Sequence, residues 1–137
     1  MGAGYSATPL PRKLGFKPGL RVHFHAAPPE LPALLGELEG VTELRRPAAP
    51  LDLVLLFVTE RRELAKRLAA LQPRLAPAGM LWVCWPKRAS GVATDVTEDV
   101  VRELALPRGL VDTKVAAIDA TWSGLRLVIR KELRAPQ

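Results

Sequence analysis

The chain has 137 residues, 48% of them hydrophobic and 25% charged, which is typical of a soluble globular domain. No apolar run approaches the ~20 residues that a membrane-spanning helix needs, and the first residues lack the apolar centre of a signal peptide. We therefore expect a cytoplasmic protein without a membrane partner. The single cysteine, Cys84, excludes an internal disulfide, and its apolar surroundings in the sequence predict a buried, unreactive thiol.

The formal net charge is +6, but the basic residues are spread over the whole chain. They are not interleaved with aromatic residues, and no nucleic-acid recognition motif is present, so solvated basic surfaces are favoured over a nucleic-acid footprint. Thirteen prolines and the lack of asparagine fit either a thermophile or a GC-rich coding bias. We expect a single domain over residues 1–137, in which residues 1–16 form an N-terminal arm and a short helix.

The N-terminal part of the chain is predicted to contain four short elements. Prolines and glycines at its ends predict a helix over 9–14, with Thr8 as the N-cap, and a strand follows over 20–26. Leucines at helical spacing then predict a helix over 28–40, and a short strand is expected over 41–46.

The central part, Leu51 to Pro86, predicts a strand, a helix and a second strand parallel to the first. From Leu51 to Val58 only Asp52 is polar, so we expect helices to cover both faces of this strand. Thr59 is the predicted N-cap of the helix. Its apolar stripe is expected at four leucines: Leu64, Leu68, Leu71 and Leu75.

That helix is predicted to end near Leu71, because Pro73 disfavours a helical conformation at the residue before it. Gly79 is expected to make a turn into the next strand, over 80–85. After a loop, Asp95 is the predicted N-cap of a further helix. The apolar line of this helix is expected at three positions: Val96, Val100 and Leu104.

Two β-rich runs follow, over 110–118 and 124–130, joined by a connection too short for a parallel crossover. They predict an antiparallel hairpin. The expected fold class is therefore α/β: a three-layer α/β/α, Rossmann-like (methyltransferase-like), mostly parallel sheet of about six strands that ends in an antiparallel hairpin.

The stretches KPGLRV, LDLVLLFV, LAPAGMLWV and the final hairpin resemble an abbreviated class I S-adenosylmethionine-dependent methyltransferase fold, over roughly residues 17–131. More closely, GYSATPLPRKLGFKPG, WPKRASGVATDVTEDVV and ATWSGLRLVIRK resemble a small bacterial family of uncharacterised domains of unknown function. This second resemblance runs nearly end to end. It implies the methyltransferase-like sheet and brings no known activity.

The chain departs from the methyltransferase pattern where the cofactor would bind. After the first strand it reads HFHAAPPELP, and Pro28 and Pro29 cannot supply the backbone N–H groups of a glycine-rich loop. Where the second strand of that fold usually ends in an acid, Arg45 and Arg46 are expected. No target-amine motif follows Val58. We therefore expect no cofactor, and S-adenosylmethionine binding is disfavoured.

The best candidate site lies beyond the carboxyl ends of the central strands, where open α/β sheets bind ligands. A loop with a lysine, a hydroxyl and a glycine before a helix suits a carboxylate or phosphate, although the same residues also fit a plain basic loop. Trp122, in the hairpin turn, either caps the core or borders a pocket. The predicted ligand-binding residues are Thr59, Lys87, Ser90, Gly91 and Trp122.

We predict no catalytic residue and no metal ligand. His23 and His25 share one face of a strand, but a metal site would need a third ligand, so a structural role is favoured. The favoured hypothesis is a non-catalytic or cryptic methyltransferase-like domain that binds a small anionic ligand or a protein partner. The alternatives are a methyltransferase with an atypical cofactor loop and an RNA-associated interaction module. A homodimer through an edge strand, either the last hairpin strand or the strand over 41–46, stays open.

Overall fold

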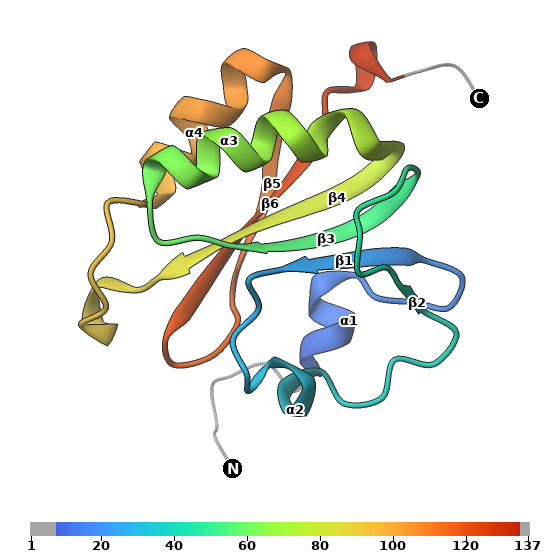
Figure 1. Cartoon of the computed structure of the whole chain (residues 1–137), viewed down its shortest axis with the longest axis horizontal. Helices are drawn as coiled ribbons and strands as arrows, with labels where there is room; N and C mark the ends of the chain where they lie inside the picture. The colour runs from blue at the N-terminus through green and yellow to red at the C-terminus, as the bar shows by residue number, and fades with distance from the viewer. Residues whose placement is uncertain (1–7, 135–137) are drawn as a thin grey trace.

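The computed structural model describes residues 8–134, so most of the predicted N-terminal arm, residues 1–7, lies outside the described residues. The elements follow the predicted order: α1 (Leu10–Leu14), β1 (Arg21–His25), α2 (Leu31–Leu35), β2 (Thr42–Glu43), β3 (Leu51–Phe57), α3 (Arg61–Leu71), β4 (Leu75–Pro86), α4 (Glu98–Ala105), β5 (Leu110–Ala117) and β6 (Trp122–Ile129), with the short 3-10 helices η1 (Gln72–Arg74), η2 (Arg88–Ser90), η3 (Leu106–Arg108) and η4 (Lys131–Leu133). Figure 1 shows how they are arranged.

The strands form a six-stranded sheet in the order β2-β1-β3-β4-β6-β5. The pairs β2–β1, β1–β3 and β3–β4 are parallel, and β6 pairs antiparallel with both β4 and β5. The predicted fold class, a mostly parallel sheet ending in an antiparallel hairpin, is confirmed. One expectation about the edges is wrong, because β6 lies inside the sheet and the edge strands are β2 and β5.

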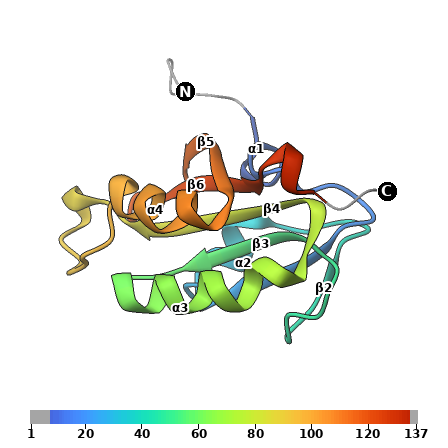
Figure 2. The same cartoon turned by 90° about the horizontal axis from the view of Figure 1, so that it is seen from above.

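Helices cover both faces of the sheet, which makes three layers (Figure 2). The face towards α3 and α4 carries one apolar cluster, and the face towards α1 and α2 carries a second one. From Leu53 to Phe57 successive residues of β3 belong alternately to the two clusters, so Val54 packs under α3 whereas Leu55 faces the opposite layer. This explains why the strand is almost continuously apolar.

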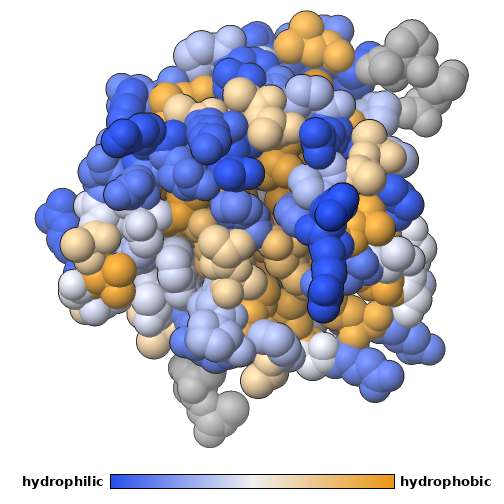
Figure 3. All heavy atoms as spheres, in the orientation of Figure 1, coloured by the Kyte–Doolittle hydropathy of each residue, from blue (hydrophilic) through white to orange (hydrophobic). Residues whose placement is uncertain are grey.

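The α3 stripe packs as predicted, since Leu64, Leu68 and Leu71 are all buried. Charged residues lie on its outer side, and Figure 3 shows hydrophilic atoms over the region of α3 and α4. Both tryptophans of β4 are buried, on opposite faces, and Trp82 donates from Nε1 to the carbonyl of Leu14 at 2.8 Å. This bond ties α1 to the centre of the sheet.

Three predicted N-caps are wrong. The N-cap of α1 is Pro9 rather than Thr8, that of α3 is Glu60 rather than Thr59, and that of α4 is Thr97 rather than Asp95. At α4 the Thr97 side chain accepts from the N–H of Val100 at 3.2 Å. The apolar line of this helix shifts with its start. Its buried residues are Val101 and Ala105 instead of Val100 and Leu104, which are only half-buried.

Gly79 does not make a turn between α3 and β4, because β4 already begins at Leu75. It lies at an irregularity in the pairing of β3 with β4, where Leu51 pairs with Leu75 but Leu53 pairs with Met80. A Cβ at Gly79 would come within 2.7 Å of the Leu51 carbonyl oxygen. The glycine is therefore needed for the close approach of two backbones.

The elements near the N-terminus are shorter than predicted. Helix α2 has five residues and ends at Gly36, whose φ is +68°, instead of continuing to Gly40. Strand β2 has two residues, Thr42 and Glu43. None of the helices in residues 8–134 is long and apolar enough to cross a membrane.

We expect Leu68→Ala to lower the free energy of unfolding by roughly 2–5 kcal/mol, because the side chain is fully buried and its loss leaves a cavity. Urea denaturation followed by circular dichroism measures the change. Lys66→Ala, on the exposed side of the same helix, is the control and should stay within about 0.5 kcal/mol of the wild type. Equal effects of the two variants would contradict the assignment of the buried face.

Candidate functional site

The parallel strands β1, β3 and β4 end at the same edge of the sheet, and a loop follows each of them. Hollows open at this edge beside all three loops. Ligands of open α/β sheets bind in such positions, because strand ends and loop backbones converge there on open space.

The first, which we call the carboxylate hollow, has a volume of about 270 Å³ and lies between the ends of β1 and β3. Phe57 and Trp122 line it with rings in edge-to-face contact, their centroids 5.1 Å apart. Thr59 lines it too, so two predicted residues come together here. Its charged groups are the carboxylates of Glu60 and Glu63, and neither lysine nor arginine contributes to the lining.

His25 is the titratable ring of the carboxylate hollow. Its Nε2 lies 3.4 Å from Oε2 of Glu63, and the same oxygen accepts from Nε of Arg67 at 2.8 Å. Burial lowers the pKa of His25 and the charge of Arg67 lowers it further, whereas Glu63 raises it. The hydrogen bond from Arg67 lowers the pKa of Glu63. At neutral pH the His25 imidazole is therefore neutral, and it lies beside the ionised carboxylate of Glu63, which is bound to Arg67.

The second hollow, which we call the Arg88 hollow, has a volume of about 410 Å³ and lies between the end of β4 and the loop that precedes α4. Arg88 is the only charged residue of its lining, which also contains Gly91 and the threonines Thr94 and Thr97. Within residues 8–134 the Arg88 side chain makes no hydrogen bond or ion pair. Its charge is thus available to a ligand.

The predicted loop residues shape this region in different ways. Ser90 Oγ donates to the Lys87 carbonyl at 2.6 Å and accepts from the N–H of Val92 at 3.2 Å, so its hydroxyl holds the loop together. The Lys87 N–H donates to the carbonyl of Thr121 at 2.7 Å. Gly91, with a φ of +77°, lines the Arg88 hollow, whereas Lys87 and Ser90 line neither hollow.

The third hollow, which we call the proline hollow, has a volume of about 410 Å³ and lies beside the loop that follows β1. That loop turns at Ala26, whose φ is +55°, and Pro28 and Pro29 then line the hollow. Glu43 lines it as well. The expectation that arginines end the second strand is therefore wrong: β2 ends in an acid, and its carboxylate borders the proline loop.

The remaining candidate ligands have structural surroundings. His23 is buried to 6% exposure and its Nδ1 hydrogen-bonds the carbonyl oxygen of Leu44 at 2.8 Å. Cys84 is buried, which raises the pKa of its thiol and keeps it protonated. Residues 8–134 contain no group of three or more histidine, cysteine, aspartate or glutamate side chains placed to hold a metal ion.

Sequence reasoning missed how the loops after β3 and β4 are joined. Asp95 Oδ1 accepts from the N–H of Arg61 at 2.6 Å, so the residue predicted to cap α4 caps α3 instead. Thr94 donates from Oγ1 to the carbonyl of Thr59 at 2.6 Å. An aspartate in a loop signals a cap, but only the folded chain shows that its partner lies in another helix.

The model of one family, described as Protein of unknown function (DUF3052), matches residues 46–131. The chain belongs to this family. The matched region includes the β3–α3–β4 unit, the Arg88 loop, α4 and the hairpin. No curated protein matches the chain.

The chain is similar in structure to several solved methyltransferases. A proposed type 11 methyltransferase from Sulfolobus solfataricus is similar with a TM-score of 0.65 and 14% identity, over 93% of this chain and 94% of that one. A SAM dependent methyltransferase from Aquifex aeolicus has a TM-score of 0.62 and 16% identity, over 86% and 87%. LepI, solved in complex with SAM, has a TM-score of 0.55 and 16% identity. The match covers 88% of this chain but only 39% of LepI. The structural similarity to these proteins shows that the chain has the methyltransferase-like Rossmann fold.

We expect Glu63→Gln to lower the pKa of His25 further below its ordinary value of 6.5, because the variant removes the carboxylate that favours the imidazolium. Proton NMR titration of the His25 ring measures the change. Glu60→Gln, in the same hollow, is the control and should leave the titration unchanged. A rise in the His25 pKa on loss of Glu63 would contradict the contact.

The lowered pKa of His25 in the wild type makes the stability of the fold depend on pH. Since His25 titrates below its unfolded value, the folded chain binds the proton less tightly than the unfolded chain. The stability from neutral His25 is therefore full at a pH above the unfolded pKa and is lost as the pH falls through the histidine range, from about 7 to 5. His25→Gln should flatten this part of the stability profile.

Proposed function

We propose that the chain is a non-catalytic methyltransferase-like domain that binds a small anionic ligand at the carboxyl edge of its parallel strands. The observation that carries the proposal is the lining of the Arg88 hollow, in which an arginine without a partner among residues 8–134 is the only charged residue. A phosphate or carboxylate would gain a charge-assisted pair there without displacing an existing one.

The polar groups around Arg88 favour a small ligand. The Thr94 hydroxyl already donates to the Thr59 carbonyl, whereas the Thr97 hydroxyl accepts from the Val100 N–H and keeps one O–H to donate, against the five N–H groups of the Arg88 guanidinium. The guanidinium is therefore the main donor that the hollow offers. Lys87 begins the same loop and adds positive charge to the region, although it does not line the hollow.

The surroundings of the other hollows support the non-catalytic part of the proposal. Pro28 and Pro29 have no N–H group to offer a cofactor phosphate or carboxylate. The carboxylate hollow, at about 270 Å³, is slightly smaller than the ~300–1,000 Å³ of typical small-molecule sites. The carboxylate of Glu60, the one in its lining that is not paired with Arg67, would also repel an anion, which directs the proposed ligand to the Arg88 hollow.

We expect inorganic phosphate, citrate or a nucleotide to raise the melting temperature of the wild type. At a hundredfold excess over the dissociation constant the gain is about 2.7 kcal/mol. A thermal-shift series, followed by isothermal titration calorimetry of the best anion, makes the measurement. Arg88→Gln should abolish the response and Lys87→Gln should reduce it. Lys66→Gln, on the exposed side of α3, is the matched control.

The result that would remove this proposal is the lack of a shift with any of these anions, together with unchanged behaviour of Arg88→Gln. A response shared by all polyanions that also weakens steeply with salt would instead support an RNA-associated module.

A second candidate is a methyltransferase with an atypical cofactor loop. It is supported by Glu43, which ends β2 and lines the proline hollow, the arrangement that ribose hydroxyls would need. Calorimetry with S-adenosylmethionine and S-adenosylhomocysteine distinguishes the two. Micromolar binding that is lost in Glu43→Gln but kept in Arg88→Gln would favour this candidate over the anion site.

A further inference from the structure

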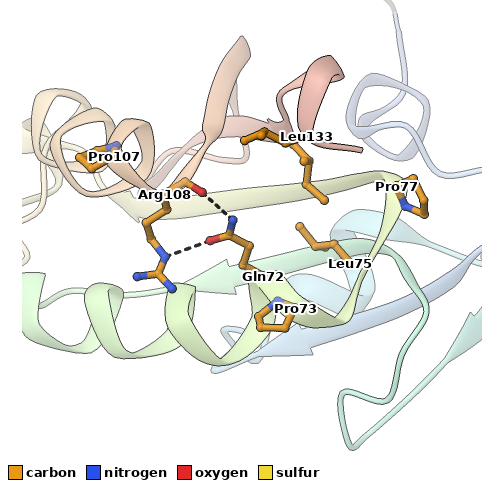
Figure 4. A pocket seen from close by; sticks show the side chains of 8 residues that line it. Gln72, Pro73, Leu75, Pro77, Pro107, Arg108 and Leu133 are labelled. Carbon is orange, nitrogen blue, oxygen red and sulfur yellow. Dashed lines mark hydrogen bonds between the residues drawn. The ribbon is translucent and has the colours of Figure 1, made fainter. Parts of the chain in front are cut away.

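A larger hollow, of about 690 Å³, lies at the opposite edge of the sheet, where α3 ends, β4 begins and β6 ends. We call it the Arg108 groove, and Figure 4 shows it from close by. Its walls are mostly aliphatic and its polar end is formed by two side chains. Its lining includes Gln72, Leu75, Pro77, Arg108, Ile129 and Leu133.

Leu133 is an apolar side chain held in an exposed position. It is 58% exposed and lies in the short helix η4. Its backbone N–H donates to the carbonyl of Arg130 at 2.8 Å, which fixes this helix locally. Its Cδ1 lies so close to Gly109 that a Cβ there would come within 2.5 Å. A further hydrogen bond, from Arg130 N–H to the Gly109 carbonyl at 3.0 Å, fixes η4 against this glycine. Leu133 thus adds an exposed apolar side chain to the mostly aliphatic walls of the groove.

Arg108 is oriented by a reciprocal pair of hydrogen bonds with Gln72. Its Nε donates to Gln72 Oε1 at 2.9 Å, and Gln72 Nε2 donates back to the Arg108 carbonyl at 2.7 Å (Figure 4). The two terminal guanidinium nitrogens have no hydrogen bond or ion pair within the part of the chain that the structure describes. A guanidinium that is fixed at Nε and open at both other nitrogens suits a two-pronged contact with a carboxylate.

The charges around the groove are nearly all positive. Its lining and the adjoining residues of η1, η3 and η4 contain five basic side chains and one acidic side chain: Arg74, Arg108, Arg130, Lys131 and Arg134, against Glu132. Glu132 is itself paired with Arg130 at 3.4 Å. The groove therefore combines an apolar floor with a basic rim, and its complement is an apolar group that carries negative charge beside it.

We propose that the Arg108 groove docks an acidic segment of a partner protein, which places an aliphatic side chain against Leu75, Ile129 and Leu133 and a carboxylate on Arg108. An RNA strand fits less well, because the lining has no aromatic ring on which a base could stack. A symmetric contact between two copies would bring two basic rims together. The inference does not depend on the anion site, which lies at the other edge of the sheet.

The direct test is fluorescence anisotropy with the labelled peptide Glu-Glu-Leu-Leu-Glu-Glu at low salt. We expect this peptide to bind. We expect no binding of Lys-Lys-Leu-Leu-Lys-Lys, which lacks the negative charge, or of Glu-Glu-Ser-Ser-Glu-Glu, which lacks the apolar side chains. Arg108→Gln should weaken binding about tenfold, the effect of losing a hydrogen bond to a charged group. Arg62→Gln, exposed near the start of α3, is the matched control and should bind as the wild type does.

Two further measurements locate the contact. The peptide should shift the methyl NMR signals of Ile129 and Leu133 more than those of Val92, which is exposed in the Arg88 hollow. Gln72→Glu keeps Arg108 but gives it an internal carboxylate, so this variant should also bind more weakly. Circular dichroism checks that each variant remains folded.

Equal binding of the acidic and basic peptides, or full binding by Arg108→Gln, would overturn the proposal. The proposal would also be overturned if the acidic peptide did not bind and did not shift the methyl NMR signals of Leu133. A dimer in sedimentation equilibrium that Leu133→Ser converts to a monomer would assign the groove to a second copy instead. Tighter binding of a single-stranded oligonucleotide than of the acidic peptide would assign it to RNA.

Discussion

The parallel pairing of β3 with β4 is the contact on which the rest of the structure depends. Both strands are buried on both faces, and their register runs without interruption from Leu53↔Met80 to Phe57↔Cys84. Each face supplies one of the two apolar clusters, so every helix packs against this pair or its neighbours. The pair also ends in the two loops that shape the candidate site, and these loops are joined where the Arg61 N–H donates to Oδ1 of Asp95.

The crossover and the hairpin could be predicted because local patterns encode them. The leucines of α3 repeat at helical spacing, and the connection before Trp122 is too short for anything but a hairpin. The caps could not be predicted in the same way. Asp95 has the local signature of an α4 cap, yet its carboxylate caps a helix that begins 34 positions earlier. The aspartate could cap either of two helices, and the relative position of the two loops decides which one. The spacing of residues in the sequence does not determine that position.

The predicted site residues lie at the carboxyl edge of the parallel strands, but they do not form one cluster. Thr59 and Trp122 share a hollow with two carboxylates, whereas Gly91 lies in a hollow with Arg88. The sequence indicates that the loops after parallel strands meet at one edge. It does not indicate which side chain of the pair Lys87 and Arg88 turns inward. The charge of each hollow, and so the class of ligand it favours, emerges only after folding.

The two ends of the parallel strands therefore carry different chemistry. At the carboxyl end the loops offer small hollows of opposite charge, which suit compact ligands. At the amino end, η4 holds Leu133 beside an oriented Arg108, which suits an extended partner. The buried side chains of β3 and β4 lie between the two edges. A conformational change at one edge would therefore have to disturb this close packing before it affected the other edge. The linings of the Arg88 hollow and the Arg108 groove share no residue, so we expect a ligand at one and a partner at the other to bind independently.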